Sequence, residues 1–321
     1  MEVSMSNRMI VGMVIGLLSS GLIPAQTLEG QSQAVFSSPV AKEAQDAYNK
    51  AVQTAWLAYQ DQVRRAAQAY VEALRQVFAA AMKAEKLEEA LLIKKEIEAY
   101  QFDVKAGLVA YYDFDQTPAG GIVKDASGQN NHGKIVGAKW DSAGRFGGAM
   151  KFNITNKTDA LIVPDSDSLD VKRVSVSVWI KTTADDEYWN RIVDKDWRNG
   201  YDLCLGGDNQ GKKFRDKAVF ECNGKAIVSD GSVIDGKWHH IVAIYDGSEM
   251  RMFVDGRKQK AVSKWTGEIT SNKYDMAVGN SKIPYEPWEF LAFDGLIDEL
   301  RIYNRPLSDK EIQLLFVSQG K

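Results

Sequence analysis

The chain has 321 residues, of which 40 are basic and 43 acidic, so its formal net charge is -3. This length allows two structured units, and the near balance of charge excludes the basic surface with which proteins bind nucleic acid or anionic membranes. A compact unit of about 200 residues buries roughly 70% of its unfolded surface and needs no dense framework of disulfides.

Residues 1-25 have the pattern of a signal peptide. Arg8 precedes an uncharged run from Met9 to Ala25, whose apolar centre is shorter than the roughly 20 residues of a bilayer span and which ends in small residues. The sequence therefore predicts an exported protein, either secreted or held in the periplasm or cell envelope; a retained anchor and a buried helix are the alternatives. Residues 26-39, rich in Ser and Gln, are predicted to be a linker.

Residues 40-104 predict a helical stalk, because no glycine or proline interrupts this stretch. Tyr48, Tyr59 and Tyr70 recur every eleven residues, a period that keeps them on one face of a straight or weakly right-handed helix. After residue 84 the phase of the apolar positions shifts, which predicts a second short helix that folds back as a helical hairpin. Its apolar positions are Leu87, Ala90, Ile93, Ile97 and Tyr100. A coiled coil that forms a homo-oligomer is the alternative use of the stripe.

Residues 107-318 predict an all-β unit. Short alternating apolar runs, such as 174-181 and 238-245, are separated by Gly, Asp and Asn turns, and Asp246-Gly247 and Asp255-Gly256 are typical of tight hairpins. Regularly spaced strands with almost no helical period favour a two-sheet sandwich. The segment 307-316 predicts one final helix, which Ser308 caps together with Glu311 in a capping box.

Several segments of this unit resemble, in order, a known family. They are residues 107-114 as an opening strand, 125-133 as an early turn motif, 174-180 as a central strand, and 236-256 with 293-308 near the end. Together they resemble the laminin-G-like, concanavalin A-like jelly-roll domains. The resemblance implies an all-β two-sheet jelly-roll sandwich, preceded here by a long α-helix or helical hairpin, and a binding module that recognises carbohydrate or a protein partner at the cell surface.

Oxygen donors cluster around glycines in the turn motif, where Asp125 and Asn131 lie; Ca²⁺ prefers such oxygens. Asp298 alternates in phase with Leu300 and Ile302, so we expect it to face the core, where an isolated carboxylate is costly. The resemblance implies a structural calcium ion held by Asp125 and Asp298 with help from the Asn131 loop. An Asx turn at Asp125 and a hydrogen-bonded Asp298 form the alternative.

Aromatic side chains in predicted loops are candidate ligand-binding residues, because flat rings stack on sugars and on partner proteins. These are Tyr188, Trp189, Trp197, Tyr285 and Trp288. Trp179 is out of phase with Val176 and Val178, which predicts that it lies on a sheet face away from the core. Packing is the alternative role for each of them.

Cys204 and Cys222 are the only cysteines. Export would permit a disulfide between them. However, Cys204 is out of phase with Leu203 whereas Cys222 shares the phase of Phe220, so the two thiols are expected on opposite sheet faces unless a bulge intervenes. A disulfide and a pair of inert thiols therefore both stay open.

Catalytic motifs are missing from the sequence. His239 and His240 are adjacent in a predicted strand and cannot share a metal ion, and neither a Gly-x-Ser-x-Gly nor a His-Glu-x-x-His pattern occurs. The Glu-x-Asp-x-x-Glu pattern of glucanases on the same broad fold is also missing. We therefore predict a non-catalytic binding protein. The rival hypotheses are a glycoside-processing enzyme on the same fold and a structural envelope protein assembled through the stalk.

Overall fold

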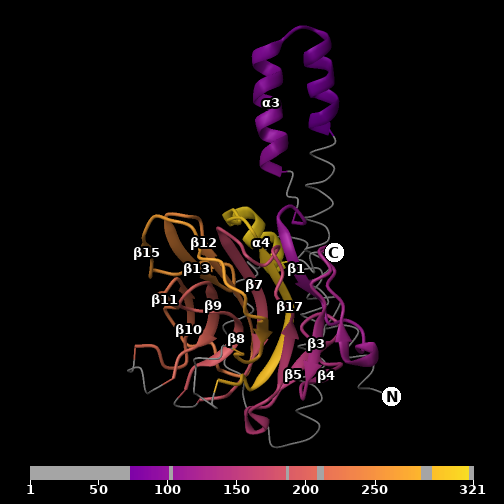
Figure 1. Ribbon diagram of the computed structural model, residues 1–321. Coiled ribbons are helices and arrows are strands. Elements are labelled where there is room, and N and C mark those ends of the chain that lie inside the picture. The colour runs from indigo at the N-terminus through magenta and orange to yellow at the C-terminus, as the bar shows by residue number, and fades with distance from the viewer. Residues whose placement is uncertain (1–72, 101–103, 186–187, 208–212, 283–290, 318–321) are drawn as a thin grey trace, which may run out of the picture. The chain divides into compact units, whose positions relative to one another are not determined.

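A computed structural model describes residues 73–100, 104–185, 188–207, 213–282 and 291–317 (Figure 1). These residues fall into two compact units, one helical and one all-β, which divide between residues 102 and 103. The predicted signal peptide, the linker and most of the stalk, with its tyrosine repeat, lie outside the described residues. Within the described ranges, no helix is both long and apolar enough to span a membrane.

The described helical unit is a short hairpin. Residues 73–83 are helical, and α3 (Leu87–Tyr100) follows a turn in which Glu85 has a φ of 60°. The predicted second helix is therefore confirmed, but Leu87 is 68% exposed and the small side chains of Ala81 and Ala90 are buried instead. Large apolar side chains that stay exposed in this unit are Val77, Met82, Leu87, Leu91 and Leu92. Assembly of the helical region into an oligomer stays a prediction.

The β unit contains two sheets. Sheet A comprises β1 (Leu108–Tyr112), β4 (Lys139–Asp141), β5 (Ala149–Phe152), β7 (Val174–Lys181), β12 (Trp238–Tyr245), β13 (Glu249–Val254), β14 (Arg257–Lys258), β15 (Ser263–Lys264) and β17 (Gly295–Tyr303). Sheet B comprises β2 (Ile122–Val123), β3 (Gly133–Val136), β6 (Ala160–Val163), β8 (Asn190–Lys195), β9 (Tyr201–Leu205), β10 (Ala218–Cys222), β11 (Lys225–Val228) and β16 (Met276–Val278). Two short 3-10 helices lie at Ala119–Gly121 and Ile154–Asn156.

The strand order of sheet A is β14-β13-β12-β7-β17-β5-β4, with β1 paired to β17 and β15 to β13, and that of sheet B is β11-β10-β9-β8-β16-β6-β3-β2. All strand pairs are antiparallel. Strands β8, β9, β10 and β11 follow one another along the chain as neighbours in sheet B, and the chain then passes to sheet A between β11 and β12. This arrangement confirms the predicted jelly-roll sandwich.

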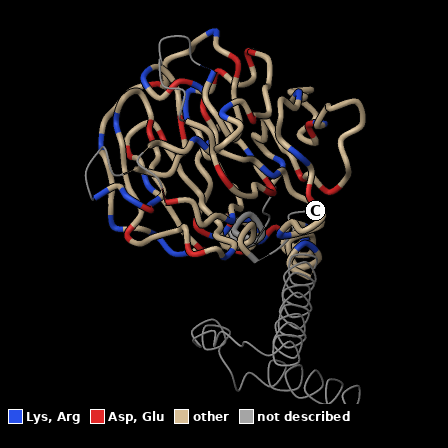
Figure 2. The backbone as a smooth tube through the Cα atoms, turned by 90° about the horizontal axis from the view of Figure 1, so that it is seen from below, with Lys and Arg blue, Asp and Glu red and all other residues tan. Residues whose placement is uncertain are grey.

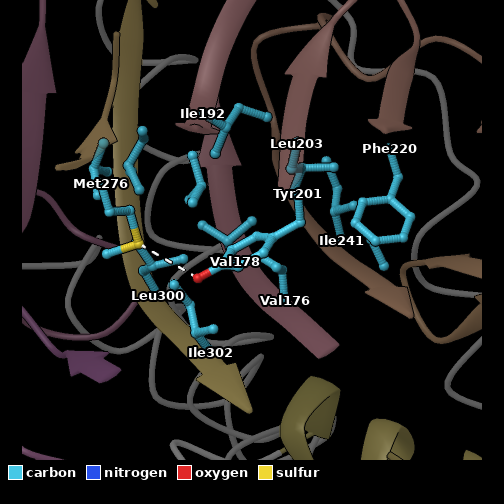
Figure 3. Packing of buried hydrophobic residues seen from close by; sticks show 14 of the residues in the cluster. Val176, Val178, Ile192, Tyr201, Leu203, Phe220, Ile241, Met276, Leu300 and Ile302 are labelled. Atoms are coloured by element: carbon cyan, nitrogen blue, oxygen red, sulfur yellow. Dashed lines mark hydrogen bonds between the residues drawn. The ribbon is translucent and has the colours of Figure 1, made fainter. Parts of the chain in front are cut away.

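The main core lies between the two sheets, where alternate residues of each strand meet (Figure 3). Val176 and Val178 of β7 contribute from sheet A, and Leu203 and Phe220 contribute from sheet B. Because the side-chain period of a strand is two, the residues between these point to the outer sheet faces. The candidate residues on these strands are Trp179 in β7, Cys204 in β9 and Cys222 in β10. The core residues next to each of them therefore decide whether it faces the core or the outer side of its sheet.

A bulge in β17 changes the side on which Asp298 lies. Asp298 pairs with Trp179 but Arg301 pairs with Ser177, and Glu299, at the irregularity, has a φ of 52°. The extra residue reverses the alternation, so Leu300 points into the core while Asp298 points to the outer face of sheet A. The prediction that Asp298 shares the core face of Leu300 and Ile302 is therefore wrong, because simple alternation cannot reveal a bulge.

Helix α4 (Asp309–Val317) covers part of the outer face of sheet A. Ile312 and Leu315 pack in a second apolar cluster that includes Val242 and Ile244 of β12. The predicted capping box is confirmed: the Glu311 N–H donates to Ser308 Oγ at 3.3 Å, and the Ser308 N–H donates to Glu311 Oε2 at 2.8 Å. Lys and Arg positions are interspersed with Asp and Glu positions along the β unit (Figure 2).

Candidate functional site

Trp179 lies on the outer face of sheet A, as predicted from its phase, but it is only 2% exposed. Phe316 of α4 stacks on its ring at 5.8 Å and His240 stacks on it at 5.1 Å. Phe146 contacts the ring edge-on at 5.8 Å, and the Arg145 guanidinium lies 4.4 Å from the ring centroid. The proposal that Trp179 offers a binding platform is therefore corrected: helix α4 and the segment around Phe146 cover it.

The candidate aromatic residues near β8 lie at opposite ends of that strand. Tyr188 and Trp189 precede β8, whereas Trp197 follows it. A strand rises about 3.3 Å per residue, so the six residues of β8 place its two ends roughly 17 Å apart. The structure therefore does not bring Trp189 and Trp197 to one binding face. Tyr285 and Trp288 lie outside the described residues.

The Trp189 end combines half-buried rings with exposed charge. The rings of Trp189 and Phe214 lie 5.6 Å apart, inclined at 57°, and the Lys213 ammonium lies 4.5 Å from the Phe214 centroid. Nearby in sequence, Arg215 donates from Nε and Nη2 to the two carboxylate oxygens of Asp185, at 3.0 and 2.5 Å. These side chains are 43% and 41% exposed, so this end presents both apolar and hydrogen-bonding groups to solvent.

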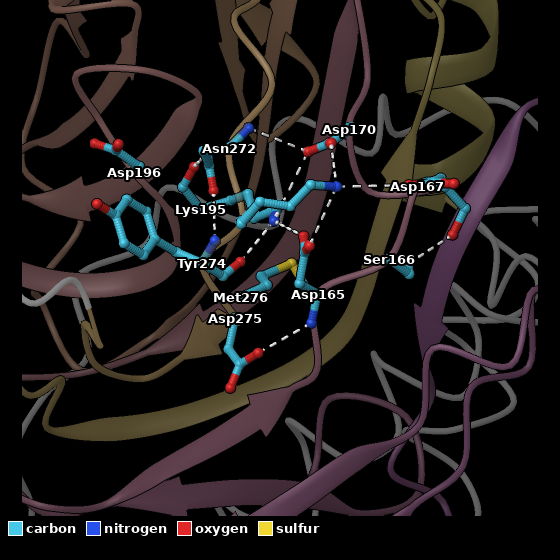
Figure 4. A network of polar contacts seen from close by, with 12 residues as sticks. Asp165, Ser166, Asp167, Asp170, Lys195, Asp196, Asn272, Tyr274, Asp275 and Met276 are labelled. Atoms are coloured by element: carbon cyan, nitrogen blue, oxygen red, sulfur yellow. Dashed lines mark hydrogen bonds and ion pairs between the residues drawn. The ribbon is translucent and has the colours of Figure 1, made fainter.

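At the Trp197 end a buried lysine organises the loops (Figure 4). Lys195, the last residue of β8, is 1% exposed, and its ammonium donates to Asp165 Oδ1 at 2.5 Å and to the Tyr274 carbonyl at 2.6 Å. The Asn272 amide donates to the Lys195 carbonyl at 3.0 Å. These bonds commit the ammonium and the carbonyl of Lys195 to internal partners, so this network joins the loop after β6 and the loop before β16 to the sheet.

The sequence patterns did not predict a charged cluster that lies on the outer face of sheet B. Arg191 of β8 donates from Nη1 to Asp202 Oδ2 and, at 3.2 Å, to Glu221 Oε2. Asp202 and Cys204 are fully buried, and their ligand atoms lie within 4.8 Å of one another and of a Glu221 carboxylate oxygen. Alternation could have predicted it, since Asp202 shares the phase of Cys204 and Glu221 is out of phase with Phe220.

Burial governs the protonation of this cluster. Burial raises the pKa of the Asp202 carboxyl well above its ordinary value, although the Arg191 charge opposes the shift. Burial also raises the pKa of the Cys204 thiol, and the neighbouring Asp202 carboxylate adds to this effect. Cys204 is consequently an unreactive thiol rather than a nucleophile.

The two cysteines form no disulfide: both are free and buried. Cys204 pairs with Val219 and Cys222 pairs with Tyr201, so they lie at different register positions of adjacent strands. Cys222 packs in the core between the sheets, whereas Cys204 faces the opposite side of sheet B. The alternation argument is confirmed, and of the two alternatives left open the structure has the pair of buried thiols, because no bulge brings them to one face.

The oxygens of Asp125 are occupied by donors from the protein itself. Oδ1 accepts the N–H groups of Tyr111 and Ser127, at 2.9 and 2.8 Å. Oδ2 accepts the Ser127 hydroxyl at 2.7 Å and the Asn131 N–H at 3.0 Å. The bond from Ser127 N–H to Oδ1 makes this an Asx turn, the alternative role for this loop.

The side-chain amide of Asn131 is also hydrogen-bonded to groups of the protein itself. Its amide nitrogen donates to the Val109 carbonyl at 2.7 Å and to Ser168 Oγ at 2.8 Å. Its amide oxygen accepts the Ser166 hydroxyl at 2.6 Å. The side chain therefore joins the turn motif to the first strand and to the loop after β6, which is a structural role.

Asp298 has different partners. Its Oδ2 accepts the Phe146 N–H at 2.9 Å and its Oδ1 accepts the Glu299 N–H at 2.7 Å. Burial raises the pKa of Asp298 to about 8, against the lowering effect of the Phe146 N–H. Asp125 and Asp298 share no hydrogen-bond partner among the described residues. A calcium site stays a prediction.

We expect Asp298→Asn to lower the free energy of unfolding by about 1–3 kcal/mol, because the new NH₂ group would face a buried backbone N–H. The loss of unfolding free energy should be the same with calcium present and with calcium removed by a chelator. Chemical denaturation of parent and variant in both conditions measures it. An ion shared with Asp125 would give a different result: calcium would raise the melting temperature of the parent and leave that of the variant unchanged.

The two neighbouring histidines lie on opposite faces of β12, as predicted. His240 Nε2 lies 2.9 Å from Ser177 Oγ, and burial lowers the pKa of His240 to about 3. His239 instead lies between two carboxylates, with Nδ1 at 2.8 Å from Asp255 and Nε2 at 3.0 Å from Asp235. A neutral buried imidazole with so low a pKa is a weak base, so the Ser177–His240 contact is a packing contact rather than a nucleophile and its base.

Comparison with protein families gives one match. Residues 155–313 match the laminin-G model described as the concanavalin A-like lectin/glucanases superfamily. The match begins shortly before β6 and extends into α4, so it covers most of both sheets. Among curated proteins, none matches this chain.

Solved structures with the same fold include binding domains. Domain 4 of the extracellular GH43 arabinanase AbnA from Geobacillus stearothermophilus, in complex with arabinotriose, is 19% identical with a TM-score of 0.50, over 66% of this chain and 98% of that chain. The binding domain of Paraclostridial Mosquitocidal Protein 1 is 18% identical with a TM-score of 0.50, over 66% and 52%. That of botulinum neurotoxin serotype D/C is 15% identical with a TM-score of 0.51, over 68% and 53%. This chain thus spans about half of each toxin domain, and these identities show a common fold alone.

Proposed function

Because the β domain belongs to the concanavalin A-like lectin/glucanase superfamily, we propose that it is the carbohydrate-binding module of an exported, non-catalytic protein. The observation that carries the proposal is the half-buried ring pair of Trp189 and Phe214 at one end of sheet B. A sugar ring gains from a flat aromatic surface flanked by hydrogen-bonding groups. The Asp185–Arg215 pair, exposed and bidentate, supplies both acceptors and donors in the sequence segments next to these rings.

The fold relatives are consistent with this proposal. Domain 4 of the arabinanase was solved with arabinotriose, and that domain matches over nearly its whole length. A protein ligand is the alternative, since the botulinum neurotoxin DC binding domain was solved with rat synaptotagmin II. The ring pair favours carbohydrate, because sugar recognition needs only a small platform whereas a stable protein interface buries about 1,200 Å² or more.

The arrangement of the acidic side chains on sheet B supports a non-catalytic role. Hydrolysis of a glycoside requires two carboxyl groups that flank the substrate, about 5–9.5 Å apart. The acidic pair of sheet B, Asp202 and Glu221, is bonded to one guanidinium, and Asp202 is fully buried. A sugar could not lie between these two groups. Export remains part of the proposal and depends on residues 1-25.

The test is a glycan array that includes arabinotriose, probed with the full-length protein, followed by calorimetric titration of the tightest ligand. Trp189→Ala should weaken binding by about 1–3 kcal/mol, as truncation of an aromatic binding residue does elsewhere. Trp197→Ala is the matched control, because it truncates a half-buried tryptophan at the other end of the same strand. Its affinity should equal that of the parent.

Two results would contradict the proposal. Array binding that neither Trp189→Ala nor Phe214→Ala weakens would place the carbohydrate site elsewhere on the domain. Absence of any glycan binding, together with capture of a protein ligand that Trp189→Ala abolishes, would favour the protein-binding alternative.

A further inference from the structure

The helical hairpin holds most of the large apolar side chains that the described residues leave exposed. Five of these seven side chains lie within residues 73–94. They are Val77, Met82, Leu87, Leu91 and Leu92. Within the same range only two apolar side chains are buried, those of Ala81 and Ala90. Such a concentration of exposed apolar side chains marks an interaction surface.

Three of the exposed side chains share one side of the hairpin. The buried Ala81 and Ala90 mark the seam where the two antiparallel helices face each other (Figure 1). A helix turns by about 100° per residue. Because the two helices run in opposite directions, the next residue after the seam position lies on the same side of the hairpin in both. Met82 and Leu91 are these next residues. Leu87 lies one turn before Leu91 and shares its face.

Phe78 extends this surface, because it lies four residues before Met82 and is only half-buried. We call these residues the hairpin face: Phe78, Met82, Leu87 and Leu91. A further turn of about 100° beyond Leu91 places Leu92 on the back of α3, away from the first helix. Leu87 and Leu92 are both 68% exposed, so they differ in direction and not in exposure.

The rest of the chain is attached to the hairpin at the end opposite its turn. Met82 and Leu87 flank the turn at residues 84–86. The preceding chain joins the first helix at residue 73, and the following chain leaves α3 after Tyr100. Residue 73 is about 14 Å from Met82 along the helix. If residues 40–72 continue this helix, as the sequence predicts, they lead away from the hairpin face.

A second copy of the chain is the partner that this surface fits. Residues 1–102 contain neither cysteine nor histidine, so no disulfide and no zinc site with those ligands can stabilise the helical unit. Very small units without such links usually depend on oligomerisation. Residues 73–100 include five basic and five acidic residues, so two copies do not repel each other and no excess charge selects an oppositely charged partner.

We propose that the helical hairpin is a dimerisation module, in which the hairpin faces of two copies pack against each other about a two-fold axis and form a four-helix bundle. A two-fold contact brings the same surface of both copies together, so the hairpin face of each copy supplies half of the bundle core. Its apolar side chains are thereby removed from water. This inference is independent of the carbohydrate proposal, because it concerns the helical unit alone.

The test is the mass of the full-length protein in solution, measured by sedimentation equilibrium over a range of concentrations. We expect the parent to have the mass of two chains. Leu87→Glu/Leu91→Glu buries carboxylates in the contact and should raise the dissociation constant of the dimer by about 100-fold or more. Leu92→Glu is the matched control: it adds the same charge at an equally exposed position on the back of α3 and should leave the dissociation constant unchanged. Circular dichroism checks that the β unit of each variant is folded.

Three results would overturn the proposal. A monomeric parent would mean that no second copy covers the hairpin face, and a loss of thermal stability in Leu87→Glu/Leu91→Glu would then show that another part of the same chain does. A dimer that this double variant retains would place the contact elsewhere, including any contact through residues 1–25, which all the variants keep. Equal weakening by Leu92→Glu would mean that the contact uses the back of α3.

Discussion

Trp179→Ala should lower the free energy of unfolding by about 3–5 kcal/mol, the usual cost of truncating a buried tryptophan. The ring is 2% exposed and contacts three aromatic rings, those of Phe146, His240 and Phe316, besides the Arg145 guanidinium. Its removal leaves a cavity under α4 that these neighbours cannot close without shifting the helix. Chemical denaturation of parent and variant measures the loss.

Two controls separate packing from binding at this position. Trp197→Ala removes a ring that is only half-buried, so its cost should be clearly smaller than that of Trp179→Ala. Trp179→Phe, which retains an aromatic ring in the stack, should recover part of the lost stability. If Trp179→Ala instead leaves stability unchanged and weakens glycan binding, helix α4 does not cover the ring in solution.

The fold was largely predictable because its signals are local and repeat along the chain. Alternation in Val174–Lys181 placed Val176 and Val178 in the core and Trp179 outside it, and the structure agrees. The capping box at Ser308 was also predictable, since it depends on residues close in sequence. What alternation could not show was the bulge at Glu299, which is set by pairing with β7 and reverses the side on which Asp298 lies.

The candidate sites were harder to predict, because they depend on which elements lie next to one another. The exposure of Trp179 is decided by a helix more than a hundred residues later in the chain. The separation of Trp189 from Trp197 follows from their places before and after one strand. Likewise, Asp202 and Glu221 meet only because β9 and β10 pair in register, although the phase of each residue was readable from the sequence.

Arg191→Met should cost about 3–5 kcal/mol, because it leaves buried carboxylates without their counter-charge. Arg191 is 3% exposed, and it bonds both Asp202 and Glu221. The exposed pair of Arg215 and Asp185 is the matched control: Arg215→Met should cost at most about 1 kcal/mol, because solvent screens that pair.

The loss in Arg191→Met should also depend on pH. Burial already raises the pKa of Asp202 while Arg191 opposes the shift, so removing the guanidinium raises this pKa further. The folded variant then binds a proton that the unfolded chain has released, and its stability falls as pH rises from the unfolded value of about 4 toward the raised pKa. Denaturation at pH 5 and pH 8 should show the larger loss relative to the parent at pH 8.

The double variant Arg191→Met/Asp202→Leu completes this test. It removes the fully buried Asp202 carboxylate together with its counter-charge. It leaves Glu221, which is partly exposed and can be hydrated, and Asp194, whose Oδ1 accepts the Asp196 N–H at 2.9 Å. Replacing a buried ion pair by apolar side chains of similar volume is often nearly neutral. The double variant should therefore be more stable than Arg191→Met alone, and a double-mutant cycle should give a coupling energy of about 0.5–3 kcal/mol. Additive losses would mean that Arg191 stabilises the sheet through its packing and not through its charge.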